Sequence, residues 1–369
     1  MRVIHFTASN GLFGAERAII ELAVAQAKAG QEVSVVSLNV GTGSSVFEKE
    51  LGHYDVDYIS LPFRKRISIR QLSMISKVLN DIDPDLVHCH NYKSNIYVSL
   101  SLINNRKIKK IATLHGYLLP KLFSYLRLYY FIDRTLLMNF DRIVLVSDKI
   151  KDRLPPRIMR SKKVYTIYNG ISTEDFKSRV SSKNVINTSE KENLKFICVG
   201  RLSPEKNYSE AIYLFSMIEK EISKSELLMV GDGPERERLE ALANDLGLGS
   251  KVFFTGYVSD ATTLIQQSDC LLITSLSEGL PMTLLEAMNS FTFVAYRDVG
   301  EIDHVLMKGE LGYRLEKNLQ VCAKDISTIL LDSTNLMSIK AKAKKRLDAQ
   351  FSAEVMEKAY RELYESLSS

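Results

Sequence analysis

The sequence predicts an α/β protein made of two doubly wound domains, each with a parallel sheet covered by helices. Short apolar strands alternate with helices in two series, and a polar stretch rich in Ser, Asn and Lys separates the series. The length of 369 residues exceeds what one hydrophobic core usually holds and suits two domains of roughly 180 residues. A hydrophobic content of 45% and a charged content of 25% exclude a disordered chain.

The domain boundaries follow from the polar stretch and from an amphipathic segment at the end of the chain. We expect a C-terminal helix that crosses back to the first domain, and one ligand cleft between the two domains. The expected parts are an N-terminal domain at 1–176, a linker at 177–193, a C-terminal domain at 194–350 and the crossing helix at 351–369.

The first series begins with a βαβ unit, which consists of a strand at 3–7, a helix at 15–30 and a strand at 32–38. Gly30 is a natural residue for the end of that helix. Helices are further expected at 69–84 and 92–106, and strands at 85–90, 109–116, 141–148 and 164–168.

The second series restarts after the linker with the same alternation. Strands are expected at 195–200, 226–231, 251–256, 291–296 and 312–316, and helices at 208–222, 233–247, 261–269 and 352–367. Between them, residues 271–288 form a strand, a loop and a helix.

The N-terminal residues and the cysteines indicate the cellular compartment of the protein. Residues 1–11 hold too short an apolar run for a signal peptide or a membrane span, so they are interpreted as a first strand. The four cysteines lie far apart without a C-x-x-C pair, which favours buried free thiols in a reducing compartment. They are Cys89, Cys198, Cys270 and Cys322. A cytoplasmic protein is therefore expected.

Charge is divided unevenly along the chain. Residues 1–180 hold 27 Lys and Arg and 16 Asp and Glu, a net charge of +11, and the remainder holds 22 and 28, a net charge of −6. The basic half could meet an anionic acceptor or an anionic membrane surface, or its charges could simply be solvated. The basic and aromatic segment 116–140 leaves the same choice between a membrane interface and a core-facing helix. We expect no nucleic acid partner.

The segment 271–288 carries the strongest chemical pattern. A buried strand leads into a loop at Glu278, Gly279, Leu280 and Pro281, and a helix follows that carries Glu286. The free N–H groups at the start of a helix bind phosphate, and carboxylates bind hydroxyl groups. This combination predicts a site for a nucleotide-sugar.

A second loop, at 200–207, also follows a strand and precedes a helix. Arg201 offers a planar fork of donors and Lys206 a point charge, which are two complementary ways to hold a diphosphate. The pair would stabilise a departing nucleoside diphosphate. The alternative is an ordinary surface pair beside Glu205.

Further strand ends are expected on the same edge, with Gly231 after one strand and Tyr257 after another. In the first half, Gly14 begins a helix and could let the backbone approach a phosphate. The spacing from Gly11 to Gly14 lacks the G-x-G-x-x-G pattern, and Asn39 replaces the acidic residue, which argues against NAD.

Histidines mark the first half. His115 ends a strand and is expected to face the cleft. His88 and His90 lie on one face of their strand, but no third ligand has a suitable spacing, so no metal site is expected. No Asp-x-Asp pair ends a strand of the second half, and Arg201 with Lys206 would therefore replace a metal ion on the diphosphate.

Together these residues resemble retaining glycosyltransferases of family four, which have the GT-B fold of two Rossmann-like domains. Seven stretches carry the resemblance in the family's order over nearly the whole chain. They are GLFGAERAIIELA, TLHG, IYNGISTEDF, VGRLSPEKN, VGDGPERERLE, FTGY and SEGLPMTLLEAM. One departure is the run from Val299 to His304, where many members have Gly-Gly-x-Pro-Glu.

The resemblance implies transfer of a sugar from a nucleoside-diphosphate sugar, with UDP expected, without an obligatory metal or other cofactor. It implies that Glu286 holds the ribose, that Glu278 lies near the transferred sugar, and that His115 lies on the acceptor side. The catalytic residues would be His115, Arg201, Lys206 and Glu278. The donor would contact Gly14, Gly200, Arg201, Lys206, Gly231, Tyr257, Glu278, Gly279, Leu280, Pro281, Met282, Thr283 and Glu286.

The expected acceptor is a glycan, in particular a lipid-linked one at the inner face of a membrane, in the synthesis of cell-surface polysaccharide, O-antigen or capsule. Two alternatives stay open. One is a catalytically silent subunit of the same fold that binds nucleotide or a partner, and the other is a nucleotide-sugar epimerase. The retaining mechanism itself does not follow from the sequence.

Overall fold

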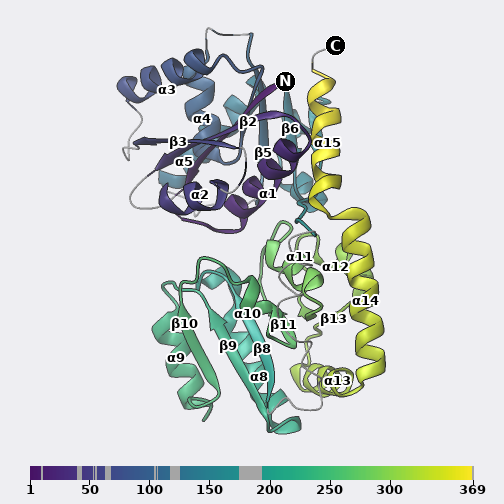
Figure 1. Ribbon diagram of the computed structural model, residues 1–369. Helices are drawn as coiled ribbons and strands as arrows, with labels where there is room; N and C mark the ends of the chain where they lie inside the picture. The colour runs from purple at the N-terminus through teal and green to yellow at the C-terminus, as the bar shows by residue number, and fades with distance from the viewer. Residues whose placement is uncertain are drawn as a thin grey trace. The chain divides into compact units, whose positions relative to one another are not determined.

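The computed structural model describes residues 1–9, 11–39, 44–52, 54, 56–62, 68–103, 105, 107–116, 125–173 and 193–367. The chain forms two compact units, of which the first combines Met1–Gly170 with Ala353–Ser369 and the second is Ile171–Ser352 (Figure 1). The expected linker lies outside the described residues except for residue 193. The expected cleft concerns the placement of one unit against the other and stays a prediction.

The first unit is built on a parallel sheet of seven strands in the order β3-β2-β1-β4-β5-β6-β7. Apolar side chains from both faces of the central strands are buried, as in other parallel sheets. The strands are β1 Arg2–Ser9, β2 Glu32–Asn39, β3 Asp57–Pro62, β4 Leu86–Cys89, β5 Lys109–Leu114, β6 Arg142–Leu145 and β7 Val164–Thr166.

Helices cover both faces of this sheet. One layer contains α3 Ile69–Ile82, α4 Tyr92–Ser101 and α5 Tyr125–Leu136, and the other contains α1 Gly14–Lys28, α2 Ser44–Leu51 and α15 Ala353–Glu365. Shorter turns complete the unit, namely η1 Leu137–Asn139, η2 Asp148–Arg153 and α6 Pro156–Met159. In the segment 116–140, α5 packs on α4, and residues 117–124 lie outside the described part.

The C-terminal helix α15 belongs to the first unit, where it packs on α1 (Figure 1). The hydroxyl of Tyr360 lies 2.9 Å from Oγ1 of Thr113, and the hydroxyl of Tyr364 lies 2.7 Å from Nδ1 of His88. The N–H of Gly170 also lies 3.2 Å from the sulfur of Met356. The two tyrosines thus bring polar groups of the helix into the core beneath β4 and β5.

The second unit is a parallel sheet of six strands in the order β10-β9-β8-β11-β12-β13. The two sheets share the doubly wound order, which reverses between β1 and β4 in one unit and between β8 and β11 in the other. The strands are β8 Leu194–Val199, β9 Ser225–Val230, β10 Val252–Gly256, β11 Cys270–Ile273, β12 Phe293–Tyr296 and β13 Tyr313–Arg314. The predicted α/β class with two parallel-sheet domains is confirmed.

Helices again form two layers. The first contains α8 Tyr208–Glu221, α9 Arg236–Asp245 and α13 Leu319–Leu331, and the second contains α10 Thr262–Gln266, α11 Met282–Asn289 and α14 Ser333–Gln350. The turns are η4 Pro204–Lys206, α12 Ile302–Val305 and η5 Met307–Gly309. Helices α13 and α14 have no counterpart among the elements expected from the sequence.

Two simpler findings complete the fold. The four cysteines are buried and unbridged, as expected. No helix in the described part of the chain has the length and apolar content needed to cross a membrane.

Candidate functional site

The loops that follow β8 and β11 lie side by side because these two strands pair at the centre of the second sheet. In the doubly wound arrangement, ligands bind at the carboxyl ends of the strands on either side of this reversal. The first loop carries Arg201 and Lys206, and the second carries Glu278. Adjacent strands therefore bring together residues that lie far apart in the sequence.

Lys206 and Glu278 form the central ion pair of this edge. Nζ of Lys206 lies 2.6 Å from Oε1 of Glu278, and both side chains are largely buried, with exposed fractions of 23% and 12%. The hydroxyl of Ser275 donates to the same carboxylate oxygen over 2.7 Å. The carboxylate is thus held in one orientation by a cation and a hydroxyl.

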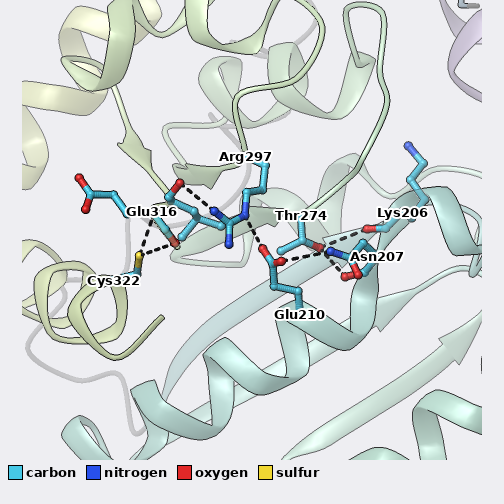
Figure 2. Close-up of polar contacts among 8 residues, drawn as sticks. Lys206, Asn207, Glu210, Thr274, Arg297, Glu316 and Cys322 are labelled. Atoms are coloured by element: carbon cyan, nitrogen blue, oxygen red, sulfur yellow. Dashed lines mark hydrogen bonds and ion pairs between the residues drawn. The ribbon is translucent and has the colours of Figure 1, made fainter. Parts of the chain in front are cut away.

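Thr274, directly after β11, fixes the turn that carries Lys206. Its hydroxyl lies 3.2 Å from the carbonyl oxygen of Lys206 and 3.1 Å from that of Asn207 (Figure 2). The N–H of Leu276 donates to the carbonyl of Glu205 over 2.8 Å. Asn207 adopts a left-handed conformation with φ of 51°, which ends the turn and begins α8.

Arg297, just after β12, supports the same turn from outside. Its Nε donates to Oε1 of Glu210 over 2.5 Å, and one terminal nitrogen donates to the carbonyl of Leu315 over 3.1 Å. The other oxygen of Glu210 accepts from the amide of Asn207 over 3.2 Å. Figure 2 shows this line of contacts from Arg297 through Glu210 to Asn207. The sequence did not reveal this support, because its members come from three distant segments.

Helix α11 presents its N-terminus at this edge. Pro281 is the N-cap residue, with φ of −71° and ψ of 132°, and no side chain caps the helix. The N–H groups of Met282 and Thr283 in the first turn have no acceptor within the helix. Glu286 lies more than a turn inside α11 and is 7% exposed. The loop before it buries Gly279 and Leu280.

Two glycines allow these loops to pack closely. A Cβ atom at Gly231, where φ is +137°, would lie 1.9 Å from the carbonyl oxygen of Gly200. A Cβ atom at Gly300, where φ is +55°, would lie 2.1 Å from the carbonyl oxygen of Gly279. The N–H of Glu301 donates to that same oxygen over 2.9 Å. The loop in which this chain departs from the family pattern therefore supports the backbone next to Glu278.

Arg201 and Tyr257 are more exposed. The side chain of Arg201 lies at the surface after β8, and no ion pair joins it to another described residue. Tyr257 follows β10 and is 50% exposed. The structure therefore unites Lys206 with Glu278, while Arg201 and Tyr257 remain accessible to a ligand.

The predicted residues of the first unit lie at the carboxyl edge of its own sheet. His115 follows β5, and Gly14 is the exposed first residue of α1. His115 lines a pocket of about 150 Å³ together with His90, Tyr92, Tyr130, Asp133 and Arg134, among others. This pocket contains aromatic and polar groups, which suit a hydroxylated ligand.

The expectation that no third imidazole accompanies His88 and His90 is wrong. His5 of β1 joins them, and possible ligand nitrogens of the three lie within 4.8 Å of one another. Each ring nitrogen of the three already has a hydrogen-bond partner in the protein. Hydrogen bonds therefore account for the arrangement. His88 and His90 do share one face of β4, with ring centroids 4.1 Å apart.

Burial disfavours the charged forms of the groups in this region. It lowers the pKa of His5 and of His115 to about 4, and it lowers the pKa of His90 well below the usual range. Burial also raises the pKa of Asp133 to about 7, although the hydrogen bond from Asn95 works in the opposite direction. At neutral pH the imidazoles of His5, His90 and His115 are therefore neutral.

Comparison with known families divides the chain in the same two halves. The profile described as "Glycosyltransferase Family 4" matches residues 14–175, and that described as "Glycosyl transferases group 1" matches residues 181–346.

Several proteins of similar sequence carry the names of enzymes that attach a sugar. The N-acetyl-alpha-D-glucosaminyl L-malate synthase of Bacillus anthracis is 26% identical over 298 residues, which span 79% of this chain and 77% of that protein. The lipopolysaccharide 1,6-galactosyltransferase of Salmonella typhimurium is 25% identical over 236 residues, which span 63% and 60%. An alpha-1,4-N-acetyl-D-galactosaminyltransferase of Campylobacter jejuni, named for an undecaprenol-linked substrate, is 27% identical over 303 residues, which span 78% and 77%.

Among solved structures, Anabaena HepE in complex with UDP-glucose matches with a TM-score of 0.79 and 19% identity, over 99% of this chain and 100% of that one. This likeness covers both units and shows the GT-B fold. The chain therefore belongs to the glycosyltransferases, with a family 4 N-terminal half and a group 1 C-terminal half on the GT-B fold.

Proposed function

We propose that this enzyme transfers a sugar from a UDP-sugar, with retention of anomeric configuration, to a lipid-linked glycan during synthesis of a cell-surface polysaccharide. The observation that carries the proposal is the ion pair of Lys206 and Glu278 beside the uncapped start of α11. A cation, free backbone N–H groups and an oriented carboxylate are the groups that a diphosphate next to a sugar requires.

Each predicted residue takes a role in this proposal. Lys206 and Arg201 bind the diphosphate, together with the N–H groups of Met282 and Thr283, and they stabilise the charge that develops on the leaving group. Glu278 orients the transferred sugar, and Glu286 holds the ribose. The base lies beside Tyr257, and His115 lies on the acceptor side. The backbone comes close to the donor at the remaining residues, namely Gly14, Gly200, Gly231, Gly279, Leu280 and Pro281.

Two relatives support the choice of donor and acceptor. HepE was crystallised with UDP-glucose, and the Campylobacter jejuni relative is named for a substrate linked to undecaprenol. The basic first half of this chain, with its net charge of +11, suits an acceptor that carries phosphate at a membrane surface. No metal or other cofactor is needed, because Lys206 and Arg201 take the place of a cation on the diphosphate.

The test is a panel of UDP-, GDP- and ADP-sugars, each added separately to the full chain. A thermal shift assay measures binding, and mass spectrometry detects the product when a membrane extract supplies the acceptor. We expect a UDP-sugar to raise the melting temperature and to be consumed only when acceptor is present. NMR of the product then reports its anomeric configuration. Consumption without acceptor and with a new sugar isomer would indicate an epimerase, and stabilisation without any consumption would indicate a silent subunit.

A further inference from the structure

A line of buried hydrogen bonds runs through the core of the first unit to His115. Oε1 of Gln26 on α1 lies 2.6 Å from Nε2 of His5 on β1, and Nδ1 of His5 lies 2.9 Å from Nε2 of His90. Nδ1 of His90 lies 3.1 Å from Nε2 of His115. Gln26, His5 and His90 are almost completely buried. We call Gln26, His5, His90 and His115 together the histidine chain.

Hydrogen-bond chemistry gives this chain a single direction. The carbonyl oxygen of Gln26 only accepts, so Nε2 of His5 must carry the proton. A neutral imidazole has one donor and one acceptor nitrogen, so Nδ1 of His5 is an acceptor. Its partner, Nε2 of His90, must then be the donor and carry the proton of that ring. By the same argument, Nδ1 of His90 is an acceptor, and its partner Nε2 of His115 carries the proton.

The last nitrogen of the chain is left without a protein partner. Nδ1 of His115 is buried and accepts no hydrogen bond from another described residue. A buried acceptor without a partner is unfavourable, and a ligand that donates a hydrogen bond removes that cost. His115 lines the pocket described above.

We propose that Gln26, His5 and His90 are positioning residues that hold His115 in the tautomer protonated on Nε2, so that its Nδ1 accepts a hydrogen bond from a sugar hydroxyl. The ligand class rests on the proposed function, whereas the tautomer rests on the contacts alone. The neutral state that this requires agrees with burial, which lowers the pKa of His5 and His115 to about 4.

The chemistry also selects against other ligands. A fully ionised oxyanion such as sulfate offers only acceptor oxygens, which a bare ring nitrogen repels, whereas a sugar hydroxyl donates. Asp133 lines the same pocket and accepts a hydrogen bond from the amide of Asn95 over 2.8 Å. A neutral ring rich in hydroxyls suits the pocket of about 150 Å³.

The experiment is NMR of the full chain labelled with ¹⁵N-histidine, without any ligand, because long-range proton–nitrogen correlations distinguish protonated from bare ring nitrogens. The signals of His115 are assigned by their loss in His115→Gln. We expect His115 to carry its proton on Nε2. A proton on Nδ1 of His115 in the wild-type protein would overturn the proposal, and this reading does not depend on donor, acceptor or turnover.

Gln26→Met tests the origin of the direction, since methionine fills a similar volume without an accepting oxygen. We expect His115 to become a mixture of both tautomers, and transfer activity to fall roughly three- to tenfold, as for the loss of one hydrogen bond. Tyr360→Phe is the matched control, because it removes a buried hydrogen bond to Thr113 in the same core and leaves the histidine chain intact. An unchanged tautomer in folded Gln26→Met would remove Gln26 from the proposal.

The ligand is tested with D-glucose and inorganic sulfate, added separately at the same high concentration. Glucose should shift the Nδ1 signal of His115, and sulfate should leave it in place. A response to sulfate, or no response to glucose, would overturn the hydroxyl assignment. Because no nucleotide-sugar is present, failure here is distinct from failure of the donor panel.

Discussion

Nζ of Lys206 lies 2.6 Å from Oε1 of Glu278, although the two residues come from different loops of the second sheet. The pair places a cation at the end that the diphosphate would occupy and a carboxylate at the sugar end. Since both side chains are largely buried, the attraction between them is screened less than at a free surface. In the proposed function, the pair would therefore serve both the stability of the empty site and the binding of the donor.

Removal of either charge should affect both properties. Lys206→Ala leaves the carboxylate of Glu278 without its cation, so we expect a loss of about 1–3 kcal/mol in the free energy of unfolding and a fall in kcat of about a hundredfold or more. Urea unfolding and initial rates check the two effects.

The double variant Lys206→Met with Glu278→Gln separates these effects. It should regain part of the lost stability, because no charge is left unpaired, and it should stay inactive. Strictly additive losses of stability would show that the pair is not coupled.

Glu286 should affect donor affinity more than stability. Glu286→Gln keeps the size of the side chain and removes the charge that would accept from the ribose hydroxyls, so we expect the Kd for UDP to rise about ten- to a hundredfold. Calorimetry with UDP measures this change. Glu221→Gln, an exposed residue near the end of α8, is the control and should leave the Kd unchanged. Equal affinities for UDP in both variants would place Glu286 outside the donor site.

Much of this site could be predicted from the sequence, because its main parts are local. A strand, a Gly-containing loop and a helix follow one another within 271–288, and helix α11 begins at Met282, directly after Pro281. The order of strands and helices along the chain also predicts that Lys206 and Glu278 lie at the same edge of the sheet, since both residues follow parallel strands. The ion pair itself could not be predicted, because the adjacency of β8 and β11 is a property of the whole sheet.

Contacts between distant segments were missed for the same reason. His5 joins His88 and His90 because β1 and β4 pair, and nothing in the local pattern of β1 shows this. Arg297 reaches Glu210 across a gap of 87 residues. Helix α14 was missed for a different reason, since only Leu336, Ala343 and Leu347 are buried and the apolar period that marks a helix is therefore weak.

The contact of Arg297 with Glu210 should support the turn of Lys206 without touching the donor. Arg297→Leu leaves the partly buried carboxylate of Glu210 unpaired and loosens its bond to Asn207, so we expect a lower melting temperature and a roughly tenfold loss of kcat. Arg297→Lys should recover part of the stability, because it restores the charge without the second bond to Leu315. Thermal unfolding and initial rates of both variants provide the check. A loss of UDP affinity as large as that of Glu286→Gln would contradict an indirect role.

Gly300 should be intolerant of any side chain. Gly300→Ala combines an unfavourable positive φ with a clash of Cβ against the carbonyl of Gly279, so we expect a loss of about 2 kcal/mol or more in the free energy of unfolding. Gly247→Ala is the matched control, because φ there is +73° and no atom lies within 4 Å of the added Cβ. It should cost only about 1 kcal/mol. Equal losses in urea unfolding would show that the loop of Gly300 yields without strain.

Asp133 should make the stability of the first unit depend on pH. Burial raises its pKa to about 7, whereas the unfolded chain loses this proton near 3.8. The folded state thus holds a proton that the unfolded state has lost, so the free energy of unfolding falls as the pH rises from about 4 to 7, by roughly 4 kcal/mol at the upper limit. Asp133→Asn keeps an oxygen that accepts from Asn95 and removes the ionisation.

Urea unfolding at pH 5 and pH 8 measures this difference in the wild type and in the variant. The wild type should lose more stability over this range than Asp133→Asn, and the two should be closest at pH 5. The other titratable groups of the pocket are unchanged by the substitution and cancel in the comparison, namely His90, His115, Tyr92, Tyr130 and Arg134. Asp81→Asn on the exposed surface of α3 should retain the wild-type slope. A parallel pH dependence in Asp133→Asn would show that Asp133 ionises near its ordinary value, and the pocket would then present a negative charge to the sugar rather than a neutral acid.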